Sequence, residues 1–143
     1  MAEKETLITV PTVDDEGRTI IVTANLDVAR FRSKDRYNLR VEVTLPYTAA
    51  GELGFPDDAT AEMLEKITES FEAHLKGKTT AVMTGIYTGG GERNWVFYTF
   101  STQTFNGFLN RSLAEVPLLP LKIYAENDPD WAEYDEMLKA VEM

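Results

Sequence analysis

The chain has 143 residues and carries 24 acidic against 14 basic side chains, with no cysteine and one histidine. This length suits one domain with its own core, and a formal net charge of −10 opposes binding to nucleic acid. The composition excludes disulfides, thiolate metal sites, cysteine nucleophiles and sites built from several histidines. No segment approaches the ~20 apolar residues that span a bilayer and the N-terminus has no leader-like run, so we expect a cytoplasmic protein without membrane contact.

The N-terminal part of the chain predicts a β-hairpin and then an amphipathic strand. Residues 7–13 and 18–26 are rich in β-branched side chains, and Asp14-Asp15-Glu16-Gly17 between them is typical of a turn. Apolar and polar residues then alternate over residues 38–47, so we expect one buried and one wet face on this strand. Its apolar positions are Leu39, Val41, Val43, Leu45 and Tyr47.

A helix is predicted next, from Ala59 to Lys76. Asp57 or Asp58 can accept hydrogen bonds from its first N–H groups, and Gly77 can adopt the left-handed conformation that ends it. The apolar residues recur at helical spacing, which predicts one buried stripe. The members of this stripe are Met63, Leu64, Ile67, Phe71 and Leu75.

Two strands, a shorter helix and a last strand follow. The strands are predicted over residues 78–88 and 93–101. Gly89-Gly90-Gly91 between them is interpreted as a hairpin turn and not as a phosphate cradle, because it precedes a strand and no Lys-Ser/Thr follows it. The helix is predicted near residues 104–114, and the strand over residues 118–126.

The C-terminal segment carries the strongest helix-start signal of the chain. We expect Asp128 at the N-cap and Pro129 at the first helical position, where a missing N–H costs nothing. The predicted apolar face of this helix consists of Trp131, Tyr134, Leu138 and Val141.

The order of elements predicts a single α+β domain over residues 1–143. A ferredoxin-like βαββαβ sandwich occupies residues 37–126, with an added N-terminal β-hairpin in residues 1–26 and a C-terminal helix in residues 128–142. The strand from Trp95 to Phe100 is apolar on both faces, so its second face must also be covered. The candidates are the C-terminal helix, the N-terminal hairpin, a dimer partner or a ligand, and we favour the first two.

Basic residues concentrate in one short segment. Five of the fourteen basic side chains fall within eleven positions that hold one acid, Asp35. The commoner interpretation is a solvated loop, and the alternative is a docking site for an anion or an acidic partner. The basic residues are Arg30, Arg32, Lys34, Arg36 and Arg40.

Acidic residues gather in two stretches. Residues 52–72 and 126–142 each hold seven acids and one base, and both are largely helical. If the two helices lay side by side, one merged acidic face would attract a basic protein surface. The alternative is that the acidic helices only keep the protein soluble.

Three further features have structural interpretations. The acids Asp128, Asp130, Glu133 and Asp135 suit the first turn of a helix, and their spacing does not match a calcium-binding loop. His74 lies beside the apolar stripe near a helix C-terminus, without a nucleophile or acid to act with. The aromatic strand from Arg93 to Phe100 lacks the small residues of RNA-binding strands, so it is interpreted as core.

Three motifs in the second half resemble those of the bacterial domain-of-unknown-function family 695. They are Thr84-Gly85-Ile86-Tyr87, Arg93-Asn94-Trp95-Val96-Phe97-Tyr98-Thr99 and Asp128-Pro129-Asp130-Trp131-Ala132-Glu133-Tyr134. The resemblance spans residues 38–138. Many members continue past the last helix with an aromatic-proline ending, whereas this chain stops at Met143. The family is similar in fold to the protein regulator B of ribonuclease E activity, so the resemblance implies a ferredoxin-like fold and a regulatory, protein-binding role, and implies no catalytic residue.

The sequence therefore predicts a non-catalytic, cytoplasmic binding or regulatory module of a bacterium that contacts a basic surface of a partner protein. No catalytic, cofactor-binding or metal-binding residue and no cofactor are expected, and the protein is expected to be a monomer or a homodimer. The alternative is a small-molecule-binding protein or an enzyme, with a pocket between the Trp95–Phe100 strand and the C-terminal helix. The residues that would contact its ligand are Trp95, Tyr98, Trp131 and Tyr134.

Overall fold

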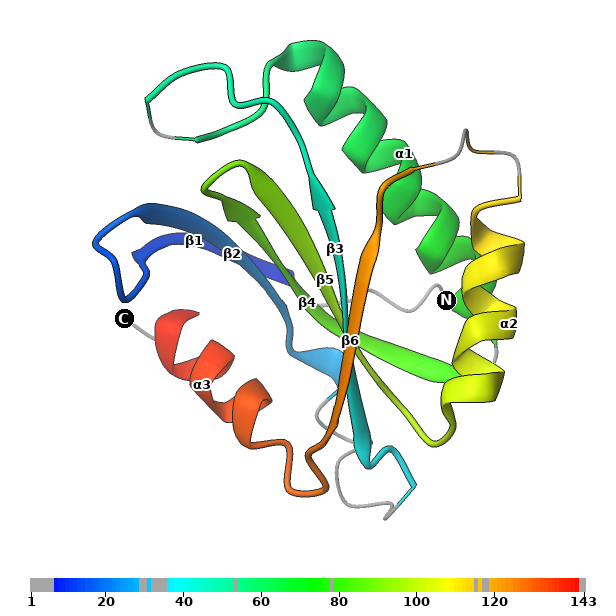
Figure 1. The fold of residues 1–143 in the computed structure, drawn as a ribbon. Helices are drawn as coiled ribbons and strands as arrows, with labels where there is room; N and C mark the ends of the chain where they lie inside the picture. The colour runs from blue at the N-terminus through cyan, green and yellow to red at the C-terminus, as the bar shows by residue number, and fades with distance from the viewer. Residues whose placement is uncertain are drawn as a thin grey trace, which may run out of the picture.

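A computed structural model describes residues 7–28, 31, 36–52, 54–77, 79–114, 116 and 119–141. In these residues the chain forms an α+β fold with a six-stranded antiparallel sheet and three helices (Figure 1). The elements are β1 (Leu7–Val13), β2 (Thr19–Asn25), β3 (Leu39–Pro46), α1 (Asp58–Leu75), β4 (Ala81–Gly89), β5 (Glu92–Thr99), α2 (Thr102–Ser112), β6 (Lys122–Asn127) and α3 (Ala132–Val141). The strand order is β1-β2-β4-β5-β3-β6, and every neighbouring pair is antiparallel. The predicted order of elements is confirmed, and the largest boundary shifts are at the starts of β6 and α3.

Helix α1 begins and ends as the sequence predicts. Oδ1 of Asp57 accepts a hydrogen bond from the N–H of Thr60 at 2.8 Å, which satisfies an unpaired donor of the first turn. Beyond the last turn, Gly77 has a φ of 71°, the left-handed conformation that glycine adopts without strain. The prediction that Met63 belongs to the buried stripe is wrong. Its side chain lies at the margin of the buried face and is 37% exposed.

Both faces of β5 are buried within one chain. Trp95 and Phe97 point toward α1 and α2, and Val96 and Tyr98 point toward α3 on the other side of the sheet. The C-terminal helix thus covers the second face, as favoured from the sequence, while β1 and β2 extend the sheet beneath it (Figure 1).

Gly85 allows α3 to lie close to the sheet. A Cβ atom at this position would lie 2.3 Å from Sδ of Met137 and 2.6 Å from the backbone oxygen of Thr23. These distances are far shorter than van der Waals contact, so only glycine admits the Met137 side chain here.

The start of α3 differs from the prediction. Asp128 does accept hydrogen bonds from the N–H groups of Ala132 and Glu133, at 2.9 and 3.0 Å. However, Pro129 lies in a turn outside the helix, and Trp131 adopts a φ of 59° before α3 begins at Ala132. This strained conformation turns the indole into the core, where Nε1 donates to the backbone oxygen of Tyr37 at 2.8 Å.

The turn between β4 and β5 is the hairpin turn that the glycines predict. Gly90 and Gly91 both have positive φ, 62° and 84°, which is the combination of a type I′ turn. None of the helices in the described part of the chain is long and apolar enough to span a membrane.

Candidate functional site

On the α3 side of the sheet, the side chains change from apolar on β2 to polar on β3 and β6. The register places Val22, Tyr87, Asn94, Thr44 and Lys122 in one row across five strands. Helix α3 packs mainly over β1 and β2. The polar end of such rows is exposed at Lys122 and Tyr124 of β6, whereas Arg40 and Thr44 of β3 are buried. We call this end the polar face, and it consists of Arg40, Glu42, Thr44, Asn94, Lys122, Tyr124 and Glu126.

Arg40 lies at the centre of the polar face. Its side chain is only 9% exposed, and it forms ion pairs with Glu42 at 3.0 Å and Glu126 at 3.3 Å. Burial is the largest single effect and opposes its charge, but Glu42, Glu133 and Tyr98 together outweigh burial and raise the pKa of Arg40 above its usual value. Its Nε atom is buried and has no hydrogen-bond partner among the described residues.

Four carboxylates from three parts of the fold interact with this arginine. Besides Glu42 and Glu126, Arg40 interacts electrostatically with Glu133 of α3 and with Asp128 before it. Glu136 interacts electrostatically with the neighbouring Tyr87, and Glu42 and Glu133 act on the same hydroxyl; all three raise its pKa. We call this group the acidic cluster, and it consists of Glu42, Glu126, Asp128, Glu133 and Glu136.

Tyr87 borders the acidic cluster and stays protonated at neutral pH. Burial raises its pKa to about 12, against the opposing effect of Arg40 and with that of Glu133 added.

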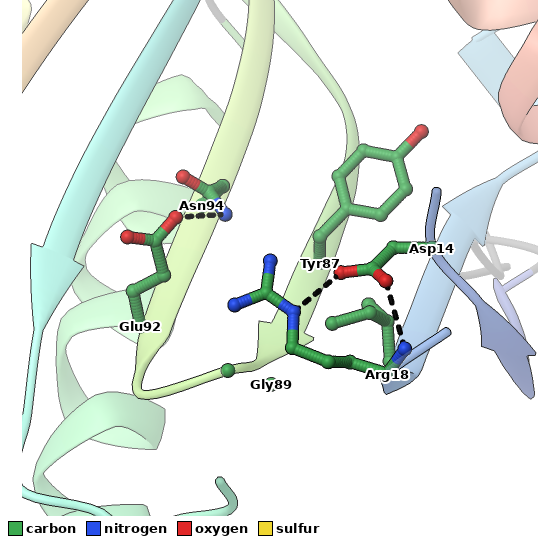
Figure 2. A pocket seen from close by; sticks show the side chains of 8 residues that line it. Asp14, Arg18, Tyr87, Gly89, Glu92 and Asn94 are labelled. Carbon is green, nitrogen blue, oxygen red and sulfur yellow. Dashed lines mark hydrogen bonds and ion pairs between the residues drawn. The ribbon is translucent and has the colours of Figure 1, made fainter. Parts of the chain in front are cut away.

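A small hollow adjoins the polar face at Asn94 (Figure 2). It lies between the β1–β2 turn and the β4–β5 turn and has a volume of about 240 Å³, below the ~300–1,000 Å³ of typical ligand pockets. Its polar groups pair with one another: Arg18 with Asp14 at 2.8 Å, and Asn94 with Glu92 at 3.4 Å. The lining residues are Asp14, Arg18, Ile20, Tyr87, Gly89, Gly90, Glu92 and Asn94.

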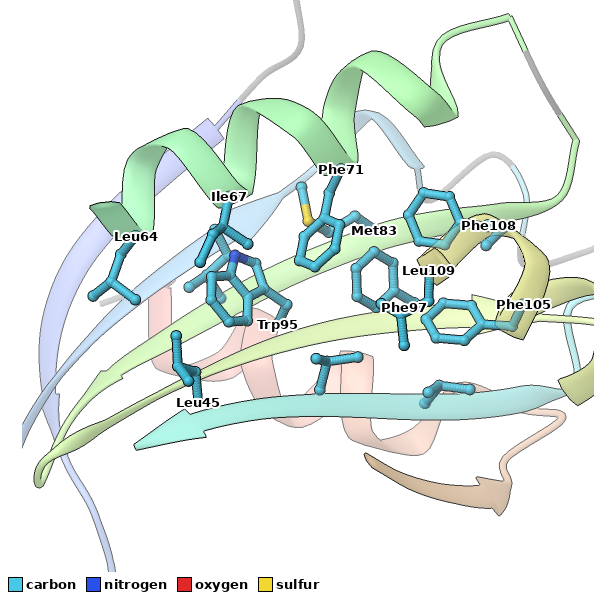
Figure 3. Packing of buried hydrophobic residues seen from close by; sticks show 14 residues of the cluster. Leu45, Leu64, Ile67, Phe71, Met83, Trp95, Phe97, Phe105, Phe108 and Leu109 are labelled. Atoms are coloured by element: carbon cyan, nitrogen blue, oxygen red, sulfur yellow. The ribbon is translucent and has the colours of Figure 1, made fainter. Parts of the chain in front are cut away.

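The structure separates Trp95 from the other aromatic residues proposed to line a pocket. Trp95 lies on the α1 side of the sheet (Figure 3). Its Nε1 donates to Oγ1 of Thr68 at 2.8 Å. Tyr98 and Trp131 lie on the α3 side, with ring centroids 4.3 Å apart, and Tyr134 packs edge-on against Trp131 at 5.4 Å. Because these rings are at most 1% exposed, they fill the space between β5 and α3. The alternation of strand side chains accounts for the separation, since positions 95 and 98 must face opposite ways.

The basic segment is described only in part. Arg30, Arg32 and Lys34 lie outside the described residues. Arg36 is exposed, with its guanidinium carbon 4.4 Å from the ring centroid of Phe100. Arg40 is buried and paired in β3, so it serves the polar face and not a basic loop.

The two acidic stretches do not merge into one face, because α1 and α3 lie on opposite sides of the sheet (Figure 1). The second stretch instead meets Glu42, a residue that the sequence analysis did not select. The sequence signal that could have identified Glu42 is its place on the polar side of the alternating β3 strand.

In the described residues, no group of three or more His, Cys, Asp or Glu is placed to hold a metal ion. His74 is partly buried, with Nδ1 2.8 Å from the backbone oxygen of Ser70.

A family model described as "Family of unknown function (DUF695)" matches residues 10–139, from within β1 to within α3. No curated protein and no solved structure matches the chain. The match includes the polar face, the acidic cluster and the Asp128–Tyr134 motif, and it extends over most of the 143 residues. The chain therefore belongs to the family of unknown function DUF695.

Proposed function

We propose that the protein is a non-catalytic binding or regulatory module of the bacterial cytoplasm whose polar face binds a basic surface of a partner protein. The observation that carries this proposal is the acidic cluster: four carboxylates interact with Arg40, and a fifth, Glu136, interacts with the neighbouring Tyr87, at the side of the sheet that lies away from the main contacts of α3 with β1 and β2. A surface of this charge attracts cationic groups and disfavours acidic partners.

The geometry supports recognition as well as attraction. Arg40 holds Glu42 and Glu126 in fixed positions through its two ion pairs. The side chains of these two glutamates are still 29% and 34% exposed, so each can accept a further hydrogen bond from a partner's lysine or arginine. A preorganised acceptor costs less entropy on binding than a mobile one.

We infer further that β3 to β6 with α1 and α2 form a ferredoxin-like unit, to which the β1–β2 hairpin and α3 are added. The strand order β4-β5-β3-β6 and the alternation of helices with strands support this inference. The family resemblance described above implies a fold similar to that of the protein regulator B of ribonuclease E activity, and we propose a regulatory role on that expectation.

The test uses fluorescein-labelled oligolysine as the probe and fluorescence anisotropy as the readout. The variant removes three charges from the acidic cluster: Glu42→Gln, Glu133→Gln and Glu136→Gln. The matched control removes three exposed charges from α1, on the other side of the sheet: Glu62→Gln, Glu65→Gln and Glu69→Gln. Both variants have the same net charge, so a difference between them reports the location of binding.

We expect the cluster variant to bind oligolysine about tenfold more weakly than the control, with a difference that shrinks as salt rises. Equal affinities of the two variants would show that the probe senses only net charge and would overturn the proposal. The same pair then serves in affinity capture. A basic protein recovered by wild type and control but lost with the cluster variant identifies the partner. An apolar ligand pocket, by contrast, would respond little to salt.

A further inference from the structure

The two edges of the sheet differ in whether another strand can pair with them. Strands β1 and β6 are the edge strands, and an edge strand presents unpaired N–H and C=O groups. The N–H of Asp14 donates to the backbone oxygen of Arg18 at 2.9 Å, which continues the β1–β2 ladder. In an antiparallel ladder, every second residue hydrogen-bonds to the neighbouring strand through its backbone. The odd-numbered residues of β1 therefore direct their N–H and C=O groups away from β2. Pro11 occupies one of these positions and has no N–H, so the β1 edge is blocked.

The β6 edge is unpaired in the part of the chain that the structure describes. The N–H of Asp128 donates to the backbone oxygen of Asn38 at 2.8 Å, so the even-numbered residues of β6 bond to β3. Ile123, Ala125 and Asn127 therefore direct their N–H and C=O groups outward, and none of the six residues is proline. No other described strand pairs with this side of β6, where the side chains of Ile123 and Tyr124 are 49% and 55% exposed.

We propose that β6 pairs antiparallel with β6 of a second copy of this chain, about a two-fold axis at Tyr124, so that two sheets join into one. The two β6 strands can hydrogen-bond only where residues with outward-directed N–H and C=O groups lie opposite each other, and this restricts the possible registers. With Tyr124 opposite the partner's Tyr124, Ile123 lies opposite the partner's Ala125 and the ladder satisfies this requirement. The same register pairs every residue from Lys122 to Glu126.

The side chains of β6 complement one another in this register on both faces of the sheet. On the α3 side, Lys122 lies opposite the partner's Glu126, and the two-fold axis repeats this ion pair. On the α1 side, Ile123 meets the partner's Ala125, which covers apolar surface that is now exposed. Opposite charges and apolar contacts directly across an antiparallel pair each stabilise it. This charge complementarity between the two ends of one strand favours a second copy as the occupant over an unrelated segment.

The proposal goes beyond the proposed function and does not depend on it. Because the axis is perpendicular to the sheet, the two polar faces would lie on the same side of the joined sheet. Glu126 of each acidic cluster would pair with Lys122 of the other copy, and the other four carboxylates would not be engaged by the new strand pair. Each copy carries a net charge of −10, so dimerisation is best measured at physiological ionic strength, where the mutual repulsion is screened.

Sedimentation over a concentration series tests the dimer. Wild type is expected to dimerise, and Ala125→Pro is expected to be monomeric, because it removes an outward N–H without breaking the bond of β6 to β3. Thr9→Pro makes the equivalent change at the β1 edge and should leave the dimer intact. Lys122→Glu, an exposed change that places like charges opposite each other, should weaken dimerisation about tenfold. Circular dichroism confirms that each variant is folded.

Cysteine cross-linking tests the register, because the chain has no cysteine of its own. Directly opposite residues in a non-hydrogen-bonded pair have Cα atoms ~4.5 Å apart, within the range of a disulfide. We therefore expect Tyr124→Cys to form a disulfide-linked dimer on mild oxidation and Asn127→Cys, far from the axis, not to do so. A wild-type monomer at all concentrations, or a dimer that survives Ala125→Pro and cross-links no faster at position 124 than at 127, would overturn the proposal.

Discussion

Tyr98 of β5 donates a hydrogen bond from its hydroxyl to Oδ2 of Asp128 over 2.7 Å, which ties the middle of the sheet to the start of α3. The carboxylate of Asp128 also accepts from the N–H groups of Ala132 and Glu133. One side chain thus satisfies the first turn of α3 and fixes its position on the sheet, while the ring of Tyr98 stacks on Trp131.

This arrangement predicts a loss of stability in acid that depends on Asp128. Burial opposes its ionisation, but the hydrogen bonds from Tyr98, Glu133 and Ala132 outweigh burial and hold its pKa below the usual 3.8. Its contribution to stability is therefore complete above the unfolded pKa and disappears as pH falls through the lower folded pKa. Asp128→Asn should lower the free energy of unfolding by about 1 kcal/mol at neutral pH and by less in acid, as measured with urea. Asp15→Asn, at an exposed turn position, serves as the control, and an equal effect of the two changes would contradict this role.

Gly85→Ala should destabilise the protein by about 2–3 kcal/mol, because the new Cβ overlaps Met137 and the backbone at Thr23. Gly107→Ala in α2 is the matched control. There a Cβ would meet only the flexible end of Arg111, at 3.3 Å, and the helix should gain up to ~1 kcal/mol. Thermal unfolding of both variants checks the pair, and a Gly85→Ala protein as stable as wild type would show that α3 does not lie this close to the sheet.

The raised pKa of Tyr87 predicts that the folded protein loses stability at high pH. Its pKa is raised from 10 to about 12, so between these values the unfolded chain releases a proton that the folded chain keeps. Unfolding therefore becomes more favourable as pH rises through this window. Tyr87→Phe should show a shallower decline in the free energy of unfolding from about pH 9 to about pH 11. Phenolate absorbance should show one fewer late-titrating tyrosine in the variant than in wild type. An unchanged slope of the free energy of unfolding against pH would contradict the prediction.

Removal of Arg40 should destabilise the fold and not only alter the surface charge. Arg40→Met leaves Glu42 and Glu126 without their cation, and since both carboxylates are partly hydrated the expected loss is about 1–3 kcal/mol in urea unfolding. Arg36→Met, at an exposed position, removes the contact with the Phe100 ring and should cost less than about 1 kcal/mol. If the two variants were equally stable, the ion pairs of Arg40 would contribute nothing net to the fold.

Local signals predicted most of the fold. The alternation in β3, the cap of α1 at Asp57 and the glycine turn after β4 all depend on residues within a few positions of one another. The predicted wet face of β3 is only partly wet, because Arg40 and Thr44 on it are buried. Two local predictions were wrong at their margins: Met63 is partly exposed, and Pro129 lies outside α3. In the second case the tertiary contacts of the Trp131 indole outweighed the local preference for a helix starting at proline.

The sequence by itself determined the order of elements, the need to cover both faces of β5, and the family, because periodicity, caps and motifs are written in neighbouring residues. Only the tertiary structure decided which side chains meet at the polar face. Arg40 and Glu126 are 86 positions apart, and their ion pair exists because β3 and β6 pair in one particular register. The same is true of the separation of the two acidic helices and of the open edge at β6. Strand order and register arise from long-range pairing, which no local window of sequence specifies.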